Sequence, residues 1–155
     1  MMANREQHGS THTAPVYRAR RILIVGCGEL GSSLAIMLSD SGNIVRVLDK
    51  NDQAFSLLPK ERIDTARILP IIGDACAERD LRRASAHESD ILIACTGSQT
   101  INLMAGQIAK NIIQIPRILC VVNDVEVAGI FEKLGIDTVV SRKIVADQLF
   151  EKAMA

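Results

Sequence analysis

The 155-residue chain carries no excess of charge of either sign, because 18 Lys and Arg residues balance 18 Asp and Glu residues. A chain without net charge has no overall field that attracts nucleic acid or an anionic membrane surface, so no nucleic-acid partner is predicted. The longest apolar runs, such as residues 91–95 and 118–122, are far shorter than the roughly 20 residues that a membrane-spanning helix needs. We therefore expect a soluble protein.

Secretory and disulfide features are missing as well. Residues 1–14 are polar and lack the apolar run of a signal peptide, which predicts a cytoplasmic location. Cys27, Cys76, Cys95 and Cys120 lie far apart and form no CxxC pair, so their spacing predicts neither a zinc site nor a redox dithiol. Three of them, Cys27, Cys95 and Cys120, should lie near the ends of neighbouring strands. A thiol sensor is one interpretation, and packing in the core is the one we favour.

Catalytic groups are not evident either. A hydride-transfer enzyme needs an acid or base near the nicotinamide, and a second domain or long loops that hold the substrate. His87, the only histidine outside the first 20 residues, falls in a polar segment where we expect it to be exposed. The sequence therefore predicts no catalytic residue and a protein that is not an enzyme.

Residues 1–20 mix polar side chains without apolar periodicity and are predicted to be a disordered tail. His8 and His12 are spaced to bind a metal on a helix, but the tail does not favour a helix, so no metal site is predicted. Residues 21–155 should form one domain, because a chain of this length with 48% hydrophobic residues buries a single core.

From residue 21 onward, short β-rich apolar runs alternate with amphipathic segments, as is typical of βαβ units. Continuous Ile, Val and Leu runs indicate strands that are covered by helices on both faces. Right-handed crossovers then predict a doubly wound, Rossmann-like α/β fold with a parallel six-stranded sheet of order 3-2-1-4-5-6. The predicted strands are residues 21–25, 44–48, 68–72, 90–94, 117–122 and 138–140, and the predicted helices are residues 30–39, 52–58, 78–85, 101–111, 125–134 and 142–154.

A glycine motif follows the first predicted strand and opens a predicted helix. It is the GxGxxG run Gly26-Cys27-Gly28-Glu29-Leu30-Gly31. The first glycine permits a tight turn, the second lets the backbone approach a pyrophosphate, and the third lets helix and strand pack closely. The amino end of the helix attracts negative charge. These six residues are candidate cofactor-binding residues.

Asp49 and Lys50 end the second predicted strand, about 20 residues after the glycine motif, where a carboxylate can accept both ribose hydroxyls of an adenosine. The alternative is a glycine-rich turn with a solvated aspartate, but loop, strand, helix and acid all occur in the order that nucleotide binding requires. Asp49 would repel a 2′-phosphate, which favours NAD or NADH over NADP. Lys50 leaves that choice open.

Two later loops leave the predicted sheet at the same edge and can line the same cleft. They are Gly73-Asp74-Ala75 and Thr96-Gly97-Ser98. Asp74 could face the adenine amino group, and the second loop could offer hydroxyl and amide groups near the phosphates or the second ribose. For Asp74 and Ser98, helix capping is an equal alternative.

Several motifs occur together in a fixed order: IVGCGELG, VLDKN, IIGDA, ACTGSQTIN with Asn102, and VVNDVEVAGIFEKLGIDTVVS. In this combination the chain resembles the RCK/KTN domain, also called the TrkA amino-terminal domain, over roughly residues 21–146. The resemblance implies a cytoplasmic, nucleotide-sensing regulatory subunit of a Trk- or Ktr-type potassium transport system. Its implied ligand is NAD or NADH, with ADP, ATP or AMP as alternatives.

The resemblance also implies partners. They are a membrane-embedded potassium transporter or channel subunit, which would hold the protein at the inner membrane, and further copies of the chain in a homodimer or a higher ring. Ile144, Val145 and Leu149 could provide the apolar pairing surface, or they could cover the sheet. Two other functions stay open: a small NAD-dependent oxidoreductase, and an RCK scaffold domain without ligand.

The chain departs from the family pattern at two positions. Glu29 stands where many members carry Arg or Gln, and a carboxylate there repels a nearby phosphate. Val121 stands where members often place an arginine. Both departures disfavour ATP. The chain also ends soon after the last predicted helix, whereas many relatives continue into a small carboxyl-terminal lobe.

Overall fold

Six parallel strands form one sheet in the computed structural model, which describes residues 18–155. The strand order is β3-β2-β1-β4-β5-β6, so the predicted order and the doubly wound class are confirmed. Strand addition reverses between β1 and β4, and this reversal leaves a crevice at their carboxyl ends. The strands are β1 (Arg21–Val25), β2 (Ile44–Asp49), β3 (Ile68–Ile72), β4 (Ile91–Ala94), β5 (Arg117–Val122) and β6 (Asp137–Val140). Most of the predicted tail, with His8 and His12, lies outside the described residues.

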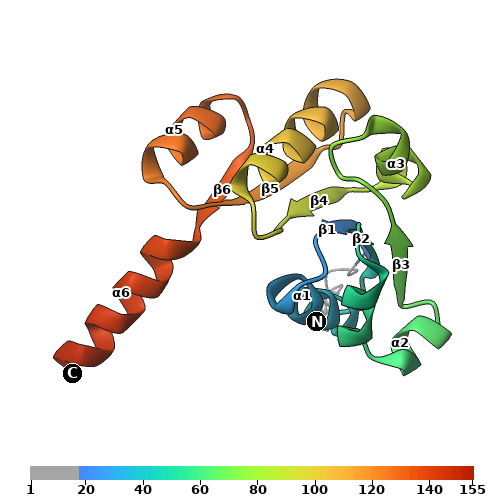
Figure 1. The fold of residues 1–155 in the computed structure, drawn as a ribbon, viewed down its shortest axis with the longest axis horizontal. Coiled ribbons are helices and arrows are strands. Elements are labelled where there is room, and N and C mark those ends of the chain that lie inside the picture. Colours follow the sequence, from blue (N-terminus) through green and yellow to red (C-terminus); the bar gives the residue numbers. More distant parts are fainter. Residues whose placement is uncertain (1–17) are drawn as a thin grey trace, which may run out of the picture.

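Helices cover both faces of the sheet, as predicted (Figure 1). On one face lie α1 (Glu29–Asp40) and α2 (Lys60–Asp64). On the other lie α3 (Glu78–Arg83), α4 (Gln99–Ile108) and α5 (Val125–Lys133).

Successive residues of the central strands enter two separate cores. In β1, Leu23 and Val25 belong to the core that α4 and α5 cover, while Ile22 and Ile24 belong to the core beneath α1. All four side chains are almost completely buried. Burial on both sides explains why β1 reads as a continuous apolar run.

The helix predicted over residues 52–58 is of a different type in the structure. The segment forms a 3₁₀ helix, η1 (Asp52–Leu57), and the short α2 that follows was not predicted. Asn51 caps η1 by accepting a hydrogen bond from the Gln53 amide at 3.1 Å. Pro59, which has no N–H, separates the two helices and stands directly before α2, where the missing donor costs nothing.

The helix predicted over residues 101–111 differs at both ends. It begins at Gln99, because Ser98 caps it, and it widens into a π-helical turn, η3 (Ala109–Ile113). Gln114 then turns the chain with a positive φ of 64°. A second 3₁₀ turn, η2 (Ala86–Glu88), precedes β4.

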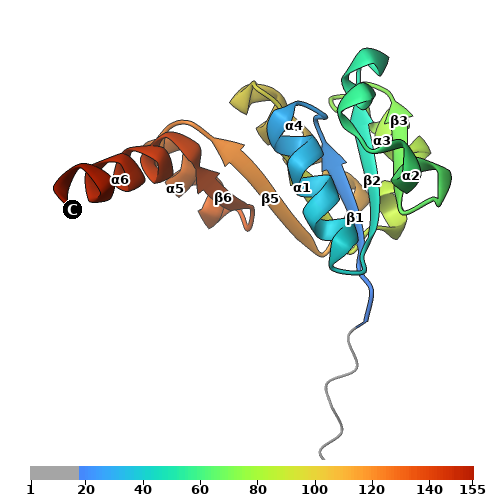
Figure 2. The same ribbon diagram turned by 90° about the horizontal axis from the view of Figure 1, so that it is seen from below.

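The last helix, α6 (Ser141–Met154), projects away from the sheet and its covering helices (Figure 2). None of its residues is buried, and Val145 and Leu149 are 57% and 63% exposed. The interpretation that these residues cover the sheet is therefore wrong. No helix within residues 18–155 has both the length and the apolar content needed to cross a bilayer.

An apolar groove lies on the α1 side of β4, β5 and β6, where helix coverage stops. Leu119 and Val121 of β5 point to this side and are only half-buried, whereas Ile118 and Cys120 point to the other core and are buried. The groove is lined by Leu30, Leu34, Ile93, Cys95, Leu119, Cys120, Val121 and Val139.

Two helical glycines give a matched test of this packing. A Cβ atom at Gly106 on α4 would lie 2.6 Å from the Cys120 sulfur, while a Cβ atom at Gly129 on α5 would meet open space. We expect Gly106→Ala to lower the free energy of unfolding by about 1–3 kcal/mol through overpacking. Gly129→Ala should raise it by up to about 1 kcal/mol, because alanine favours the helix. Urea denaturation measures both, and equal effects would contradict the close packing of α4 on β5.

Candidate functional site

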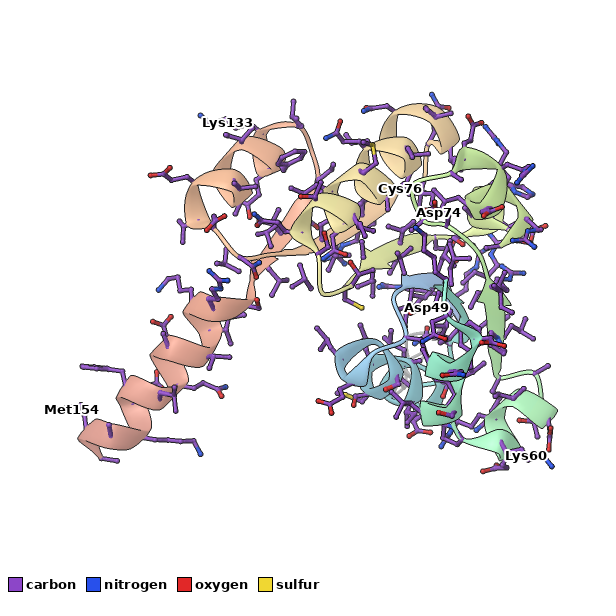
Figure 3. The ribbon with its side chains drawn as sticks, in the orientation of Figure 1. Asp49, Lys60, Asp74, Cys76, Lys133 and Met154 are labelled. Carbon is purple, nitrogen blue, oxygen red and sulfur yellow. The ribbon has the colours of Figure 1, made fainter. Side chains whose placement is uncertain are left out.

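A cavity of about 190 Å³ opens where β1, β2, β3 and β4 end. Its walls combine strand-end backbone with charged side chains, and Figure 3 shows two of the carboxylates, Asp49 and Asp74. Among the predicted site residues, the cavity brings together Gly26, Asp49, Lys50, Gly73, Asp74, Ala75 and Thr96. Three further lining residues were not predicted: Val25, Leu48 and Ile101.

The glycine motif is shaped by close contacts. Gly26 has a φ of +102°, which L side chains rarely adopt, and a Cβ atom there would lie about 3 Å from Thr96. A Cβ atom at Gly31 would lie 1.9 Å from the Gly26 carbonyl oxygen. Gly28 is exposed, and a Cβ atom there would meet nothing within 4 Å. The first and third glycines therefore hold the turn together, and the second leaves open space beside the amino end of α1.

Asp49 connects β2 to the glycine motif. Its Oδ2 accepts a hydrogen bond from the Cys27 amide at 2.7 Å, and its Oδ1 accepts one from the Asn51 amide at 2.8 Å. A carboxylate has about four acceptor positions, so Asp49 can still accept hydrogen bonds from hydroxyl groups in the cavity. The side chain thus holds the loop and faces the cavity at the same time.

Asp74 makes local contacts at the opposite wall. Its Oδ1 accepts a hydrogen bond from the Cys76 amide at 2.9 Å, and its Oδ2 lies 3.5 Å from Lys50 Nζ. The Asp74 amide donates to Asp80 Oδ2 at 2.8 Å, and this bond lowers the pKa of the Asp80 carboxyl. Asp74 thus forms a local turn and lines the cavity but does not cap α3, whose N-cap is Ala77.

The loop after β4 is largely engaged within the protein. The Thr96 hydroxyl lies 2.6 Å from Asn102 Oδ1 and 3.1 Å from the Ser98 carbonyl oxygen, and it accepts from the Ser98 amide at 3.2 Å. The Ser98 hydroxyl caps α4 by accepting from the Ile101 amide. The capping role expected for Ser98 is thus observed, and contact of these hydroxyls with a ligand stays a prediction. Ser98 and the exposed Gly97 do not line the cavity.

The remaining predicted residues lie around the cavity rather than in its wall. Cys27 is buried behind the loop, and Glu29 is exposed in the first turn of α1. Leu30 is 53% exposed and lines the apolar groove instead. The missed residues are apolar: Val25 ends β1, Leu48 is the last residue but one of β2, and Ile101 lies in the first turn of α4. Their place at strand ends and a helix start is the signal that could have identified them.

Burial disfavours the thiolate form of three of the thiols. It raises the pKa of Cys27 and of Cys95 to about 11 and that of Cys120 to about 12. The Asp49 carboxylate adds to the shift at Cys27. The packing interpretation fits these thiols better than the sensor interpretation, since the thiolate is the reactive form. Within residues 18–155, no group of three or more His, Cys, Asp or Glu side chains could hold a metal ion.

Cys76 is the exposed thiol of the described chain, which gives a direct test. We expect iodoacetamide at about pH 7 to label Cys76 well before the three buried thiols, because reaction needs an accessible thiolate. Peptide mass spectrometry measures the order of labelling, and Cys76→Ser is the control that should stay unlabelled over the same time. Labelling of Cys27 at the rate of Cys76 would restore the sensor interpretation.

Comparison with known proteins adds to this geometry. A family model described as the TrkA-N domain matches residues 22–142. A Trk system potassium uptake protein TrkA from Streptomyces coelicolor is 28% identical over 133 residues, which are 86% of this chain and 58% of that relative. The chain thus spans little more than half the length of this curated relative.

Two solved structures share the fold. The TrkA-N domain of the inner membrane protein ybaL from Escherichia coli has a TM-score of 0.72 at 17% identity, covering 88% of this chain and 98% of that one. The Kef carboxyl-terminal domain from Shewanella denitrificans, in an AMP-bound form, has a TM-score of 0.71 at 21% identity, covering 86% of this chain and 79% of that one. The family model spans most of the sequence and includes every residue that lines the cavity, so the chain belongs to the TrkA-N family, the RCK/KTN group that its motifs resemble.

Proposed function

We propose that this chain is a nucleotide-sensing regulatory module of a Trk- or Ktr-type potassium uptake system, and that its ligand is NAD or NADH. One observation carries the proposal. The Asp49 carboxylate, which holds the glycine motif through the Cys27 amide, also faces a cavity at the switch point of the sheet. Nucleotides bind at this place in doubly wound folds.

The cavity residues fit an adenosine. The Asp49 carboxylate would accept hydrogen bonds from the ribose hydroxyls, and the apolar side chains of Val25, Leu48 and Ile101 would contact the adenosine. The open space at Gly28, beside the amino end of α1, would admit phosphate. The AMP-bound form of the structurally similar Kef domain supports this choice of ligand class.

Two side chains disfavour ligands with three phosphates. Glu29 is exposed in the first turn of α1, where its carboxylate repels phosphate oxygens. Val121 is an apolar residue of the groove and cannot pair with a phosphate. We therefore rank ATP last, and we keep NAD or NADH as the first choice with ADP and AMP as the alternatives.

The proposed role is binding without turnover, and the proposed partner is a membrane-embedded potassium transporter or channel subunit. The resemblance to the Streptomyces Trk protein supports this partner. A nucleotide that binds one arrangement of the module more tightly than another would shift the population between them, which is how a sensor acts on its partner. The second candidate, a small oxidoreductase, predicts consumption of NADH with a carbonyl substrate.

Calorimetry tests the nucleotide proposal. NAD and NADH should bind to the wild-type chain, and Asp49→Ala should weaken that binding by about 1–3 kcal/mol, the cost of leaving buried hydrogen-bonding groups without partners. Asp52→Ala removes a neighbouring carboxylate on exposed η1 and should leave the affinity unchanged. If NAD, NADH, ADP and AMP all fail to bind at millimolar concentration, the proposal is wrong.

We also propose that the chain is a homodimer or part of a higher ring. On α6, Val145 and Leu149 lie one turn apart and exposed, and the Lys143–Asp147 ion pair lies on another side of the helix. Figure 3 shows how far the tip of α6, Met154, stands from the sheet. A projecting helix with exposed apolar side chains and an uncovered apolar groove on one chain would be the two halves of a self-complementary interface.

Leu149→Asp tests the dimer, because a buried unpaired carboxylate opposes association. We expect analytical ultracentrifugation to find the wild-type chain associated and Leu149→Asp monomeric. Leu57→Asp, at a 49% exposed leucine on η1, is the matched control and should remain associated. A monomeric wild-type chain, or an associated Leu149→Asp chain, would refute the α6 interface.

A further inference from the structure

Asn102 is a polar side chain that is almost completely buried. It lies in the first turn of α4 and is 1% exposed. Burying an amide is unfavourable unless its hydrogen bonds are made. Asn102 makes all of them: Oδ1 receives the Thr96 amide at 2.8 Å and the Thr96 hydroxyl at 2.6 Å, and Nδ2 donates to the carbonyls of Thr96 at 3.1 Å and Val121 at 2.9 Å.

These bonds connect two strands at the point where they separate. The β4–β5 ladder ends at the pair Ala94–Cys120. Beyond it, the side-chain amide of Asn102 lies between Thr96 and Val121 and takes the place of a backbone peptide group. Its Nδ2 donates to the Val121 carbonyl on one side, and the amide pairs with both the N–H and the carbonyl of Thr96 on the other. The end of β5 is thereby fixed to the loop after β4.

Thr96 passes this constraint to the cavity. It lines the cavity, and its backbone and methyl group approach Gly26 so closely that a Cβ atom on the glycine would lie about 3 Å from them. The position of Thr96 therefore sets the position of the glycine motif. Asn102 does not line the cavity itself, so any effect on a ligand acts through Thr96.

On the side away from the cavity, the end of β5 contacts the residue at which α6 begins. Val122 is paired with Val140, the last residue of β6, and its carbonyl lies 3.5 Å from the Ser141 hydroxyl at the start of α6. A second amide in the first turn of α4 supports the same region. Gln99 accepts from the Asn123 amide at 2.9 Å and donates to Asp124 Oδ2 at 3.0 Å.

We propose that Asn102 is the positioning residue of the cavity, and that it couples the occupancy of the cavity to β6 and the start of α6. The inference rests on the proposed nucleotide binding. A ligand that favours one position of Thr96 also favours one position of the end of β5, because one rigid amide holds both. The coupling is reciprocal, so a partner that holds α6 changes the affinity for the nucleotide by the same factor.

Hydrogen exchange with NAD as the probe tests the coupling in the full chain. Saturating the wild-type protein with NAD should slow amide exchange at β6 and at the first turn of α6 by about fivefold or more relative to α2. A factor of about five is the low end of the coupling found between two binding sites. α2 is the reference because it lies on the opposite face of the sheet from α4. Comparison with α2 corrects for a general stabilisation of the protein by NAD. Asn102→Ala should bind NAD roughly tenfold more weakly. When the Asn102→Ala variant is saturated with NAD, the glycine motif should remain protected from exchange, whereas β6 should not.

Each other outcome has a distinct meaning. If NAD does not bind to the wild-type chain, the proposed function fails. If NAD binds but protects nothing beyond β4, or protects β6 equally in saturated Asn102→Ala, the coupling is overturned and the nucleotide site stands.

Asn111→Ala, at an exposed asparagine of η3, is the control and should behave as the wild type. Gln99→Ala removes the supporting amide from a partly exposed site and keeps the test valid if Asn102→Ala does not fold. It should reduce protection at the start of α5 and at β6 while leaving NAD affinity within about threefold, since Gln99 does not line the cavity and bonds to Asn123 and Asp124 rather than to Thr96. Full protection in Gln99→Ala would count against the role of this helix turn.

Discussion

The contact between Gly31 and Gly26 is the constraint on which the site depends. The Gly26 carbonyl oxygen occupies the space of a missing side chain on α1, so α1 begins closer to β1 than any other residue would allow. This approach places the amino end of α1 at the crevice, next to a turn in which Gly26 has a φ of +102°. The Asp49 carboxylate then locks the turn from the neighbouring strand.

Contacts within the protein itself hold the side chains of the cavity in place. Asp49 and Asp74 each accept a backbone amide, and Lys50 lies within ion-pair distance of Asp74. Side chains that are already oriented lose little further freedom when they bind, which favours recognition over chemistry that needs a mobile acid or base. The cavity and the apolar groove therefore differ in what they can hold, since charged side chains line the cavity and none lines the groove.

Local patterns in the sequence predict the central part of the fold well. The apolar runs give all six strands within one residue, and the glycine motif with Asp49 locates the crevice. These local patterns fail where contacts with other parts of the chain determine the structure. The helix predicted over residues 52–58 is the 3₁₀ helix η1, and the short α2 after Pro59 was not predicted. The exposed side of β5 was not foreseen, because Leu119 and Val121 are as apolar as their buried neighbours. Asn102 was visible as part of a family motif, but its partners lie 6 and 19 residues away, so only the folded chain shows its role.

The projection of α6 has a consequence for its own folding. Isolated helices of fewer than about 12–15 residues are marginal in water, because nucleation is costly and packing supplies most of their stability. The helix has 14 residues, and none is buried against its own domain. In the proposed dimer or ring, the packing that stabilises α6 would come from whatever covers it, so this segment would order and the chains would associate in a single cooperative event. Dilution would then unwind α6 while leaving the six-stranded sheet intact, and helix content measured by circular dichroism would report on the proposed association.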